Sequence, residues 1–327
     1  MTAPTALICG VSGQDGTYLA ELLLSKGYTV IGTSRDAQTA RLENHSHLSV
    51  AGRIRLESMA THDFRSVLQV LRKVQPDEIY NLSGQSSVGL SFEQPVETLD
   101  SIVAGTLNFL ECIRFLGRPI RFYNAGSGEC FGNAGLSGAT EVTAFSPRSP
   151  YAVAKAAAFW LVANYRDAYG LHASTGILFN HESPLRPERF VTRKIVAAAS
   201  RISLGLQRDK LVLGNIRIRR DWGWAPEYVD AMWRMLQQPS GGDFVIATGI
   251  SYFLEEFVHE AFAQVGLDWK DYTIVSDDFL RPTDIEDGRG DASKAKKVLS
   301  WQARSHMKDV VAMMMQAELA MLASRNR

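Results

Sequence analysis

A glycine-rich turn between a strand and a helix is the feature that most constrains how this chain can fold. The stretch ALICGVSGQDGTYLAELL places Gly10, Gly13 and Gly16 between an apolar run and a segment with helical spacing. Glycine permits a tight turn and a close approach to a pyrophosphate, which the free N–H groups of the following helix attract. The spacing is GxxGxxG rather than GxGxxG, and a turn that binds nothing is the alternative. We predict a dinucleotide-binding loop.

Short apolar strands alternate with amphipathic helices through the first half of the chain. Strand patterns occur at 5–10, 28–34, 53–58, 78–83 and 120–126, with helical patterns at 17–27, 63–74 and 102–117. Later patterns indicate helices at 151–169, 190–206 and 229–238, and strands at 172–179, 210–215 and 243–249. This alternation predicts an α/β fold: a Rossmann-type doubly wound parallel sheet, with a smaller C-terminal mixed α/β lobe that the chain enters more than once.

The composition argues against several classes of function. The 327 residues carry 35 basic and 35 acidic side chains, so no net charge favours nucleic acid or an anionic membrane. No apolar run is long enough for a membrane span, and the N-terminus lacks a signal sequence. Cys9, Cys112 and Cys130 are scattered, as is typical of reduced thiols rather than disulfides or metal ligands. We expect a cytoplasmic enzyme without a metal.

The segment TSRDAQ, after the second strand, bears on the choice of cofactor. NAD-binding folds place an acidic residue here for the ribose hydroxyls, whereas an Arg suits a 2′-phosphate. Arg35 comes first, beside Ser34, and Asp36 follows. We therefore expect NADP, with NAD less favoured. The alternative is an Arg that is simply solvated at the strand end.

Two segments carry a candidate catalytic site. NAGSGECFG follows an apolar strand and holds Ser127 and Glu129, and PRSPYAVAK holds Tyr151 and Lys155 on one helix face. A nearby ammonium stabilises a phenolate and lowers the pKa of the tyrosine, which can then exchange a proton with a sugar hydroxyl while hydride moves. For Glu129, the alternative is a strand-end carboxylate paired with an Arg or Lys.

The chain resembles an extended short-chain dehydrogenase/reductase. More narrowly, it is similar to the GDP-mannose 4,6-dehydratase family over nearly its whole length. The matching blocks are GVSGQDGTYLAELLLSKGY, EIYNLSGQSSVGLSF, PRSPYAVAK, GILFNHESPLR, FVTRKI, LGNIRIRRDWG and VIATG. The resemblance implies an NADP-dependent lyase that acts on a GDP-sugar in deoxysugar and polysaccharide biosynthesis.

The resemblance also implies a reaction and a role for each catalytic residue. Hydride leaves sugar C4 for NADP⁺, a base removes the C5 proton that the new ketone acidifies, water leaves C6, and hydride returns to C6. Glu129 is the candidate base and also the candidate acid. Tyr151 serves C4 oxidation, Lys155 orients the nicotinamide ribose, and Ser127 hydrogen-bonds the sugar.

Further binding residues follow from the matching blocks. Those implied for the cofactor are Gly10, Gly13, Gln14, Asp15, Gly16, Arg35, Ser58, Leu82, Tyr151 and Lys155. Those implied for the substrate are Ser86, Asn180, Glu182, Lys194, Gly214, Arg220, Arg281 and Asp284. The cations would grip the diphosphate, and Asp284 would lie near the guanosine ribose. Residues 1–178 with about 224–249 would form the NADP-binding domain, and about 179–223 with 250–327 the nucleotide-sugar-binding domain.

Three departures from the family pattern matter. The segment 35–47 lacks an Arg pair that builds a tetramer in relatives, so a homodimer and a homotetramer both stay open. Ser58 stands where an Asp usually meets the adenine. Gly126 and Gly128 replace larger residues beside the sugar, which predicts room for GDP-manno-heptose as well as GDP-mannose.

Two other functions compete with dehydration. A nucleotide-sugar reductase or epimerase on the same fold would use the Tyr and Lys without needing Glu129. A non-catalytic dinucleotide sensor would keep the sheet and lose the chemistry, which the presence of Ser127, Tyr151 and Lys155 argues against.

Overall fold

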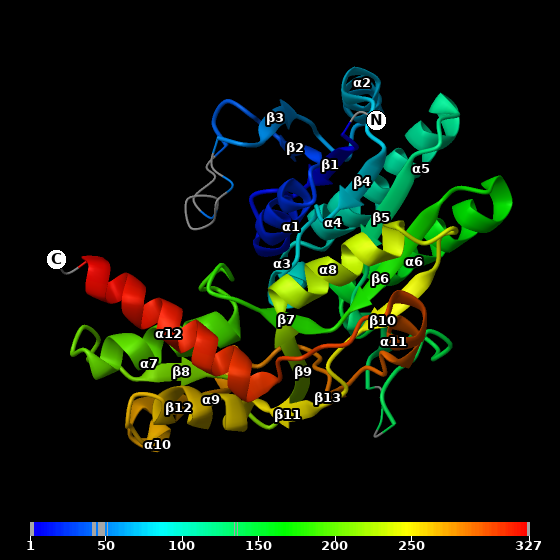
Figure 1. Cartoon of the computed structure of the whole chain (residues 1–327). Coiled ribbons are helices and arrows are strands. Elements are labelled where there is room, and N and C mark those ends of the chain that lie inside the picture. The colour runs from blue at the N-terminus through cyan, green and yellow to red at the C-terminus, as the bar shows by residue number, and fades with distance from the viewer. Residues whose placement is uncertain are drawn as a thin grey trace.

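Seven parallel strands form the central sheet of the described chain. The computed structural model describes residues 3–325 apart from 41–43, 45–49, 51, 134 and 136, and the strand order is β10-β6-β5-β4-β1-β2-β3 (Figure 1). The strands are β1 (Thr5–Cys9), β2 (Thr29–Ser34), β3 (Arg55–Ser58), β4 (Glu78–Asn81), β5 (Arg121–Ala125), β6 (Ala173–Leu178) and β10 (Asp243–Ile246). The strand order reverses between β1 and β4, where ligands bind in sheets of this kind. The predicted doubly wound sheet is confirmed.

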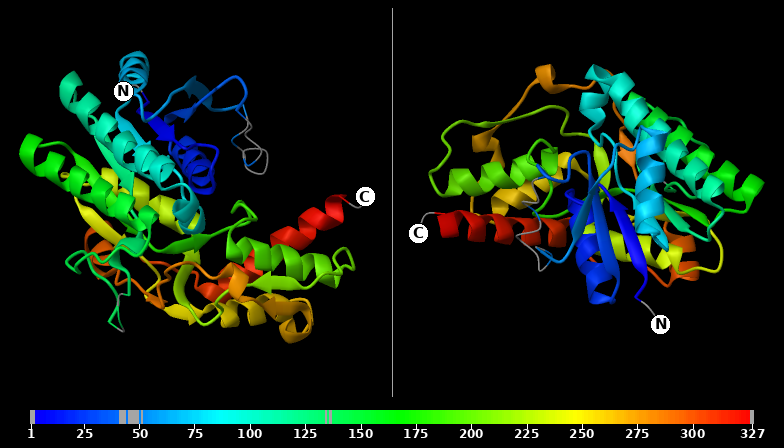
Figure 2. Two further views of the ribbon diagram at one scale, coloured as in Figure 1. Left: turned by 180° about the vertical axis from the view of Figure 1, so that it is seen from behind. Right: turned by 90° about the horizontal axis from the view of Figure 1, so that it is seen from above.

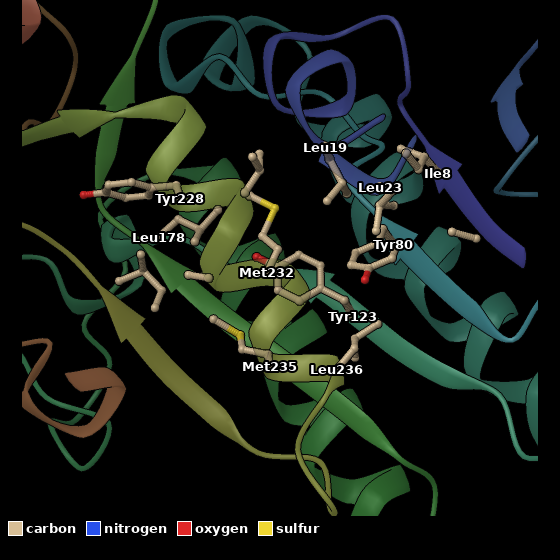
Figure 3. Packing of buried hydrophobic residues seen from close by; sticks show 14 of the residues in the cluster. Ile8, Leu19, Leu23, Tyr80, Tyr123, Leu178, Tyr228, Met232, Met235 and Leu236 are labelled. Carbon is tan, nitrogen blue, oxygen red and sulfur yellow. The ribbon is translucent and has the colours of Figure 1, made fainter. Parts of the chain in front are cut away.

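Helices cover both faces of the sheet. They are α1 (Gln14–Ser25), α2 (Phe64–Val74), α5 (Gly105–Leu116), α6 (Pro150–Tyr169) and α8 (Ala225–Leu236). Because successive side chains of a strand point to opposite faces, Ile8 joins an apolar cluster with α1 and α8, while Leu7 joins one with α2, α5 and α6. Figure 3 shows the first cluster, with Leu23 of α1 and Met232 of α8 over the sheet.

Short helical segments connect these elements at the edge that faces the second lobe. They are α3 (Val88–Glu93), α4 (Pro95–Leu99), the π-helix η2 (Asp100–Ala104) and the 3₁₀-helix η3 (Gly128–Phe131). None of the helices in the described part of the chain is long and apolar enough to cross a membrane.

The smaller lobe has its own apolar core. Its strands are β7 (Asn180–Glu182), β8 (Leu211–Leu213), β9 (Arg219–Trp224), β11 (Ser251–Phe253), β12 (Thr273–Val275) and β13 (Asp287–Gly288). Its helical segments are α7 (Val191–Ser203), α9 (Leu254–Ala263), α10 (Trp269–Tyr272), η4 (Asp277–Phe279) and α12 (Met307–Arg325). Side chains of α7, β9, α9 and α12 form the core. Figures 1 and 2 show α12 beside α7, on the opposite side of the molecule from α5 and α6.

The chain returns to the large sheet after building this lobe. Helix α11 (Ser293–Leu299) packs against β10 and α8, and Leu299 and Trp301 belong to the same apolar cluster as α1 and α8. The indole N–H of Trp301 donates to the Glu227 carbonyl of α8 at 2.8 Å. Residues 293–303 therefore pack with the large sheet, although the sequence assigned them to the second domain.

The glycine-rich turn is compact for a steric reason. Gly10 has φ of +85°, and a Cβ at Gly16 would lie 2.3 Å from the Gly10 carbonyl oxygen. A Cβ at Gly13 would meet only that oxygen, at 3.3 Å, and otherwise open space within 4 Å. Gly10 and Gly16 thus close the turn, while Gly13 leaves its outer surface clear.

Candidate active site

A cavity of about 820 Å³ lies where the carboxyl ends of the large sheet meet the smaller lobe. Its wall brings together most of the residues that the sequence singled out: Asp15, Leu82, Ser86, Ser127, Glu129, Tyr151, Lys155, Asn180, Glu182, Lys194, Gly214, Arg220, Arg281 and Asp284. It does not include Gly10, Gly13, Gln14, Gly16, Arg35 or Ser58. The catalytic and substrate candidates therefore share one cavity, and most of the cofactor candidates lie beyond it.

Helix capping positions the two catalytic segments. The Ser127 hydroxyl accepts from the Glu129 N–H at 3.2 Å, so the same side chain that lines the cavity also starts η3. Ser149 accepts from the Ala152 N–H at 3.1 Å and Pro150 occupies the first turn, so α6 starts immediately before Tyr151.

Tyr151 and Lys155 are buried together, but their electrostatics differ from the sequence prediction. The Lys155 ammonium donates to the Ala125 carbonyl at 2.7 Å and lies 5.7 Å from the Tyr151 ring centroid. Burial raises the pKa of Tyr151, and hydrogen bonding to Ser127 offsets only part of that rise. Burial also lowers the pKa of Lys155 to about 8. In this arrangement the pKa of Tyr151 is raised rather than lowered, because desolvation of the phenolate is the largest effect, and the lowering by Lys155 that the sequence predicted is not seen.

Glu129 begins a line of alternating charges that runs through the cavity wall. Its side chain is 16% exposed, and its Oε1 lies 3.8 Å from Nε of Arg220. Arg220 donates from Nη2 to Oδ1 of Asp284 at 2.8 Å and from Nη1 to the Ile285 carbonyl at 2.7 Å. Nη1 of Arg281 lies 3.5 Å from the same Asp284 oxygen. The expectation for Arg220 was a diphosphate contact; here its Nη2 holds Asp284, its Nη1 donates to the Ile285 carbonyl, and its Nε faces Glu129.

Two substrate candidates are engaged in holding the fold together. Glu182 is buried and accepts from the Thr192 hydroxyl at 2.7 Å, with Nε of Arg186 at 3.3 Å, so it fixes the start of α7. Lys194 donates to the Val212 carbonyl at 2.8 Å, and its ammonium lies 5.1 Å from the Phe279 ring centroid. The sequence did not predict either contact.

A partly buried ion pair connects the start of α1, next to the glycine-rich turn, to the smaller lobe. Nε2 of His181 lies 2.9 Å from Oδ2 of Asp15, and Nδ1 lies 2.8 Å from the Phe179 carbonyl. Both acceptors require an N–H, so the imidazole is doubly protonated. Burial alone would lower the pKa of His181, but the charge and hydrogen bond of Asp15 raise it. Burial alone would raise the pKa of Asp15, but His181 lowers it.

Gln14 strengthens the same connection. Its amide donates to the His181 carbonyl at 3.1 Å and accepts from the Ser183 hydroxyl at 2.8 Å. The side chain is 5% exposed. Gln14 was expected to contact the cofactor; its amide instead joins α1 to β7 and the residue that follows it.

Gly126 and Gly128 do not provide the room that the sequence suggested. A Cβ at Gly128 would lie 3.0 Å from the Phe179 ring, and one at Gly126 would lie 2.9 Å from the Gly176 carbonyl oxygen. Both positions need glycine because neighbouring groups pack closely against them. The steric argument for a bulkier heptose is therefore wrong, because the missing side chains would point into packed protein.

The cofactor candidates outside the cavity have local roles. Ser58 accepts from the Ala37 N–H at 3.0 Å and so fixes the chain after β2. Asp36 accepts from the Gln38 N–H at 2.9 Å, and this hydrogen bond lowers its pKa. Arg35 lies between these contacts, at the end of β2. Residues 41–43 and 45–47 of the following segment lie outside the described residues.

The cavity also contains residues that the sequence analysis did not select. Arg186 and Arg189 line it from the turn before α7, and Asp278 and Phe279 line it from η4. Arg186 follows FNHESP within a matching block, so its cation was a signal that could have been used. Asp278 and Phe279 lie in a segment without a regular pattern, and nothing in the sequence placed them at the cavity.

Comparison with known proteins identifies close relatives. A family model described as GDP-mannose 4,6 dehydratase matches residues 7–314. GDP-mannose 4,6 dehydratase 1 of Arabidopsis thaliana is 46% identical over 332 aligned positions, which cover 98% of this chain and 91% of that protein.

Solved structures share the fold at much lower identity. The dTDP-glucose 4,6-dehydratase of Bacillus anthracis, in complex with NAD, superposes with a TM-score of 0.83 at 19% identity and covers 96% of each chain. RMD of Pseudomonas aeruginosa, complexed with NADPH, gives 0.78 at 21% identity over 98% of each chain.

The Asp15–His181 pair predicts a specific pH dependence of stability. A raised pKa of His181 contributes stability that is fully present below its ordinary value of 6.5 and is lost as pH rises through the higher folded value. Asp15, with a lowered pKa, contributes stability above 3.8, so it adds no slope in this range. The free energy of unfolding should therefore fall from this source as pH rises from 6 to 8.5.

Urea unfolding of His181→Gln at the two pH values should lack that part of the slope. The exposed His259 of α9 offers a matched control, and His259→Gln should keep the wild-type slope. Equal slopes in His181→Gln and wild type would contradict the assignment of a charged imidazole.

Proposed function

Because the chain belongs to the GDP-mannose 4,6-dehydratase family, we propose that it is a hydro-lyase that converts GDP-mannose into the GDP-4-keto-6-deoxy sugar with loss of one water. The observation that carries this proposal is the presence of Ser127, Glu129, Tyr151 and Lys155 in one cavity. A Tyr and a Lys serve any reductase or epimerase of this fold. A carboxylate beside them is required when a C5 proton and a C6 hydroxyl must also leave.

A nicotinamide cofactor fits the turn after β1. Gly13 leaves the outer surface of the turn open, and the N-terminus of α1 supplies N–H groups and the positive end of its dipole. Gly10, Gly13 and Gly16 would hold its pyrophosphate, with Leu82 near the ring system. When bound, the cofactor takes hydride from C4 and returns it to C6.

Tyr151 and Ser127 act on the oxygen at C4. Tyr151 exchanges a proton with the C4 hydroxyl, and Ser127 donates to the same oxygen. Since burial keeps the proton on Tyr151, the Lys155 charge must approach the phenol oxygen more closely for that proton to leave. Lys155 donates to Ala125 in this structure, so a change of partner is part of the proposal.

Glu129 acts at C5 and C6. It takes the C5 proton as a carboxylate and then returns a proton to the departing C6 hydroxyl. Arg220 supports the ionised carboxylate from 3.8 Å, and Asp284 keeps that guanidinium from pairing fully with Glu129. The Glu129 carboxylate therefore keeps oxygen lone pairs free to take a proton.

The rest of the cavity suits the nucleotide. Arg281 and Lys194 are assigned to the diphosphate, because cations at a partly enclosed wall bind phosphate oxygens strongly. Asn180 is assigned there as well, because its amide N–H groups can donate to phosphate oxygens. Ser86 and Gly214 line the sugar and nucleoside ends.

The proposed division of the chain is a cofactor domain (1–178 with about 224–249) and a nucleotide-sugar domain (about 179–223 with 250–327), except that 293–303 pack with the first.

NADP is the proposed cofactor. Arg35 stands at the end of β2, where a 2′-phosphate of the cofactor would lie, and a guanidinium binds phosphate in a bidentate manner. NAD is the alternative, because Asp36 follows directly. The Asp36 carboxylate already accepts from the Gln38 N–H, which leaves it less available for a ribose.

A homodimer is the proposed assembly. Val153 and Trp160 lie seven residues apart on one face of α6, at 46% and 63% exposure, and Val96 of the neighbouring α4 is 71% exposed. An apolar face on paired helices of this kind is covered when a second copy packs against it. A tetramer through 35–47 has less support, since the segment lacks the Arg pair of its relatives.

Glu129→Gln should separate oxidation from dehydration. The rate of water loss from GDP-mannose, followed by mass spectrometry, should drop by roughly 10²–10⁴ because the general base is gone. C4 oxidation does not need the carboxylate, so reduced cofactor should accumulate, visible by absorbance. Tyr151→Phe is the control and should produce neither signal. Dehydration by Glu129→Gln at the wild-type rate would contradict the mechanism.

Arg35→Ala should remove the preference for NADP⁺. We expect KM for NADP⁺ to rise roughly tenfold, from the loss of one charged hydrogen-bonding partner, with KM for NAD⁺ little changed. Initial rates with each cofactor measure both values. A wild-type enzyme that turns over NAD⁺ more efficiently than NADP⁺ would reverse the assignment.

Trp160→Glu should shift the protein from dimer to monomer in light scattering, because a charge would be buried in the interface. Ile274→Glu, which places the same charge on a half-exposed apolar position of β12, is the matched control and should remain dimeric. A wild-type protein that is monomeric at micromolar concentration would refute the interface.

A further inference from the structure

The cavity ends at a turn whose side chains suit a nucleobase. η4 and the residues after it rest on the smaller lobe: the Ser276 N–H donates to the Leu213 carbonyl at 2.9 Å, and β12 pairs with β8. A Cβ at Gly214 would lie 2.6 Å from the Phe279 carbonyl oxygen, so the turn packs directly on that glycine. The turn is therefore a fixed part of the cavity wall.

Phe279 presents an aromatic ring at this end. It is 57% exposed although it lines the cavity, and the Lys194 ammonium lies 5.1 Å from its ring centroid. An apolar ring that is half exposed beside a cation is a suitable surface for a flat heterocycle, which stacks on it with little dependence on sequence or substituents.

Asp278 adds a hydrogen-bond acceptor beside the ring. It is exposed and lines the cavity, and its Oδ2 accepts from the Ser276 hydroxyl at 3.2 Å. Among the described residues, its Oδ1 has no hydrogen-bond partner. A carboxylate is an acceptor only, so it matches a ligand edge that carries two neighbouring donors.

The order of groups along the cavity places the base here. Glu129 and Tyr151 occupy the sugar end. Arg220 and Arg281 follow through their shared contact with Asp284, and Phe279 lies two residues from Arg281. A sugar at Glu129 and a diphosphate at the cations leave the nucleoside for the Asp278–Phe279 end.

We propose that Asp278 selects guanine by accepting from its N1–H and 2-amino groups while Phe279 stacks on the ring. This inference rests on the proposed function and adds the residue that selects the nucleobase. Adenine offers an acceptor at N1 and no 2-amino group, so it would face the carboxylate with one lone pair against another. Hypoxanthine keeps N1–H but lacks the amino group.

Calorimetric binding of GDP, IDP and ADP to the full-length protein with saturating NADP⁺ tests the proposal. The wild type should bind GDP roughly tenfold more tightly than IDP, as expected for one hydrogen bond to a charged acceptor, and ADP more weakly still. Asp278→Ala should bind GDP and IDP equally. The isosteric Asp278→Asn, which keeps the shape of the side chain, should also lose most of the preference.

Two further variants separate the roles. Asp277→Ala removes a neighbouring carboxylate of the same turn that does not line the cavity, and it should keep the wild-type ratio. Phe279→Leu should weaken GDP and IDP by similar factors, because stacking does not sense the amino group. Equal affinity of the wild type for GDP and IDP, or an unchanged ratio in Asp278→Ala, would overturn the inference alone. No binding of GDP and no conversion of GDP-mannose would overturn the proposed function itself.

Discussion

The buried pair of Asp15 and His181 is the constraint on which the site depends. Charges removed from water are stable only when they are paired and hydrogen-bonded, and here the Phe179 carbonyl satisfies the remaining imidazole N–H. The imidazole also stacks on Tyr228 of α8, with ring centroids 4.5 Å apart. The His181 side chain thus holds together the start of α1, the first strand of the smaller lobe and helix α8. The cavity lies where these elements meet.

The same desolvation governs the reacting groups. Burial raises the pKa of Tyr151, which keeps its proton, and lowers the pKa of Lys155. It also makes the spacing of charges along Glu129, Arg220 and Asp284 important, because two charges interact more strongly at a given distance where water is excluded.

The sheet and its helices could be predicted from the sequence, because alternating apolar patterns encode them, and the resemblance to the family supplied the substrate candidates that line the cavity. The pairing of charged and polar side chains could not be predicted in this way. Nothing local shows that Gln14 bonds to Ser183 or that Arg220 holds Asp284, since these contacts join segments far apart in the chain. Gly126 and Gly128 show the opposite error: an absent side chain was taken as space, and only the positions of Gly176 and Phe179 reveal the close packing.

The return of α11 to the large sheet has a consequence for how the two lobes can move when nucleotides bind. The chain passes between the two lobes several times, and Trp301 also packs against α8. The smaller lobe therefore has little freedom to rotate about a hinge. The cavity between the lobes should therefore keep its shape, and nucleotide binding should need adjustment of side chains rather than a clamshell motion of the lobes.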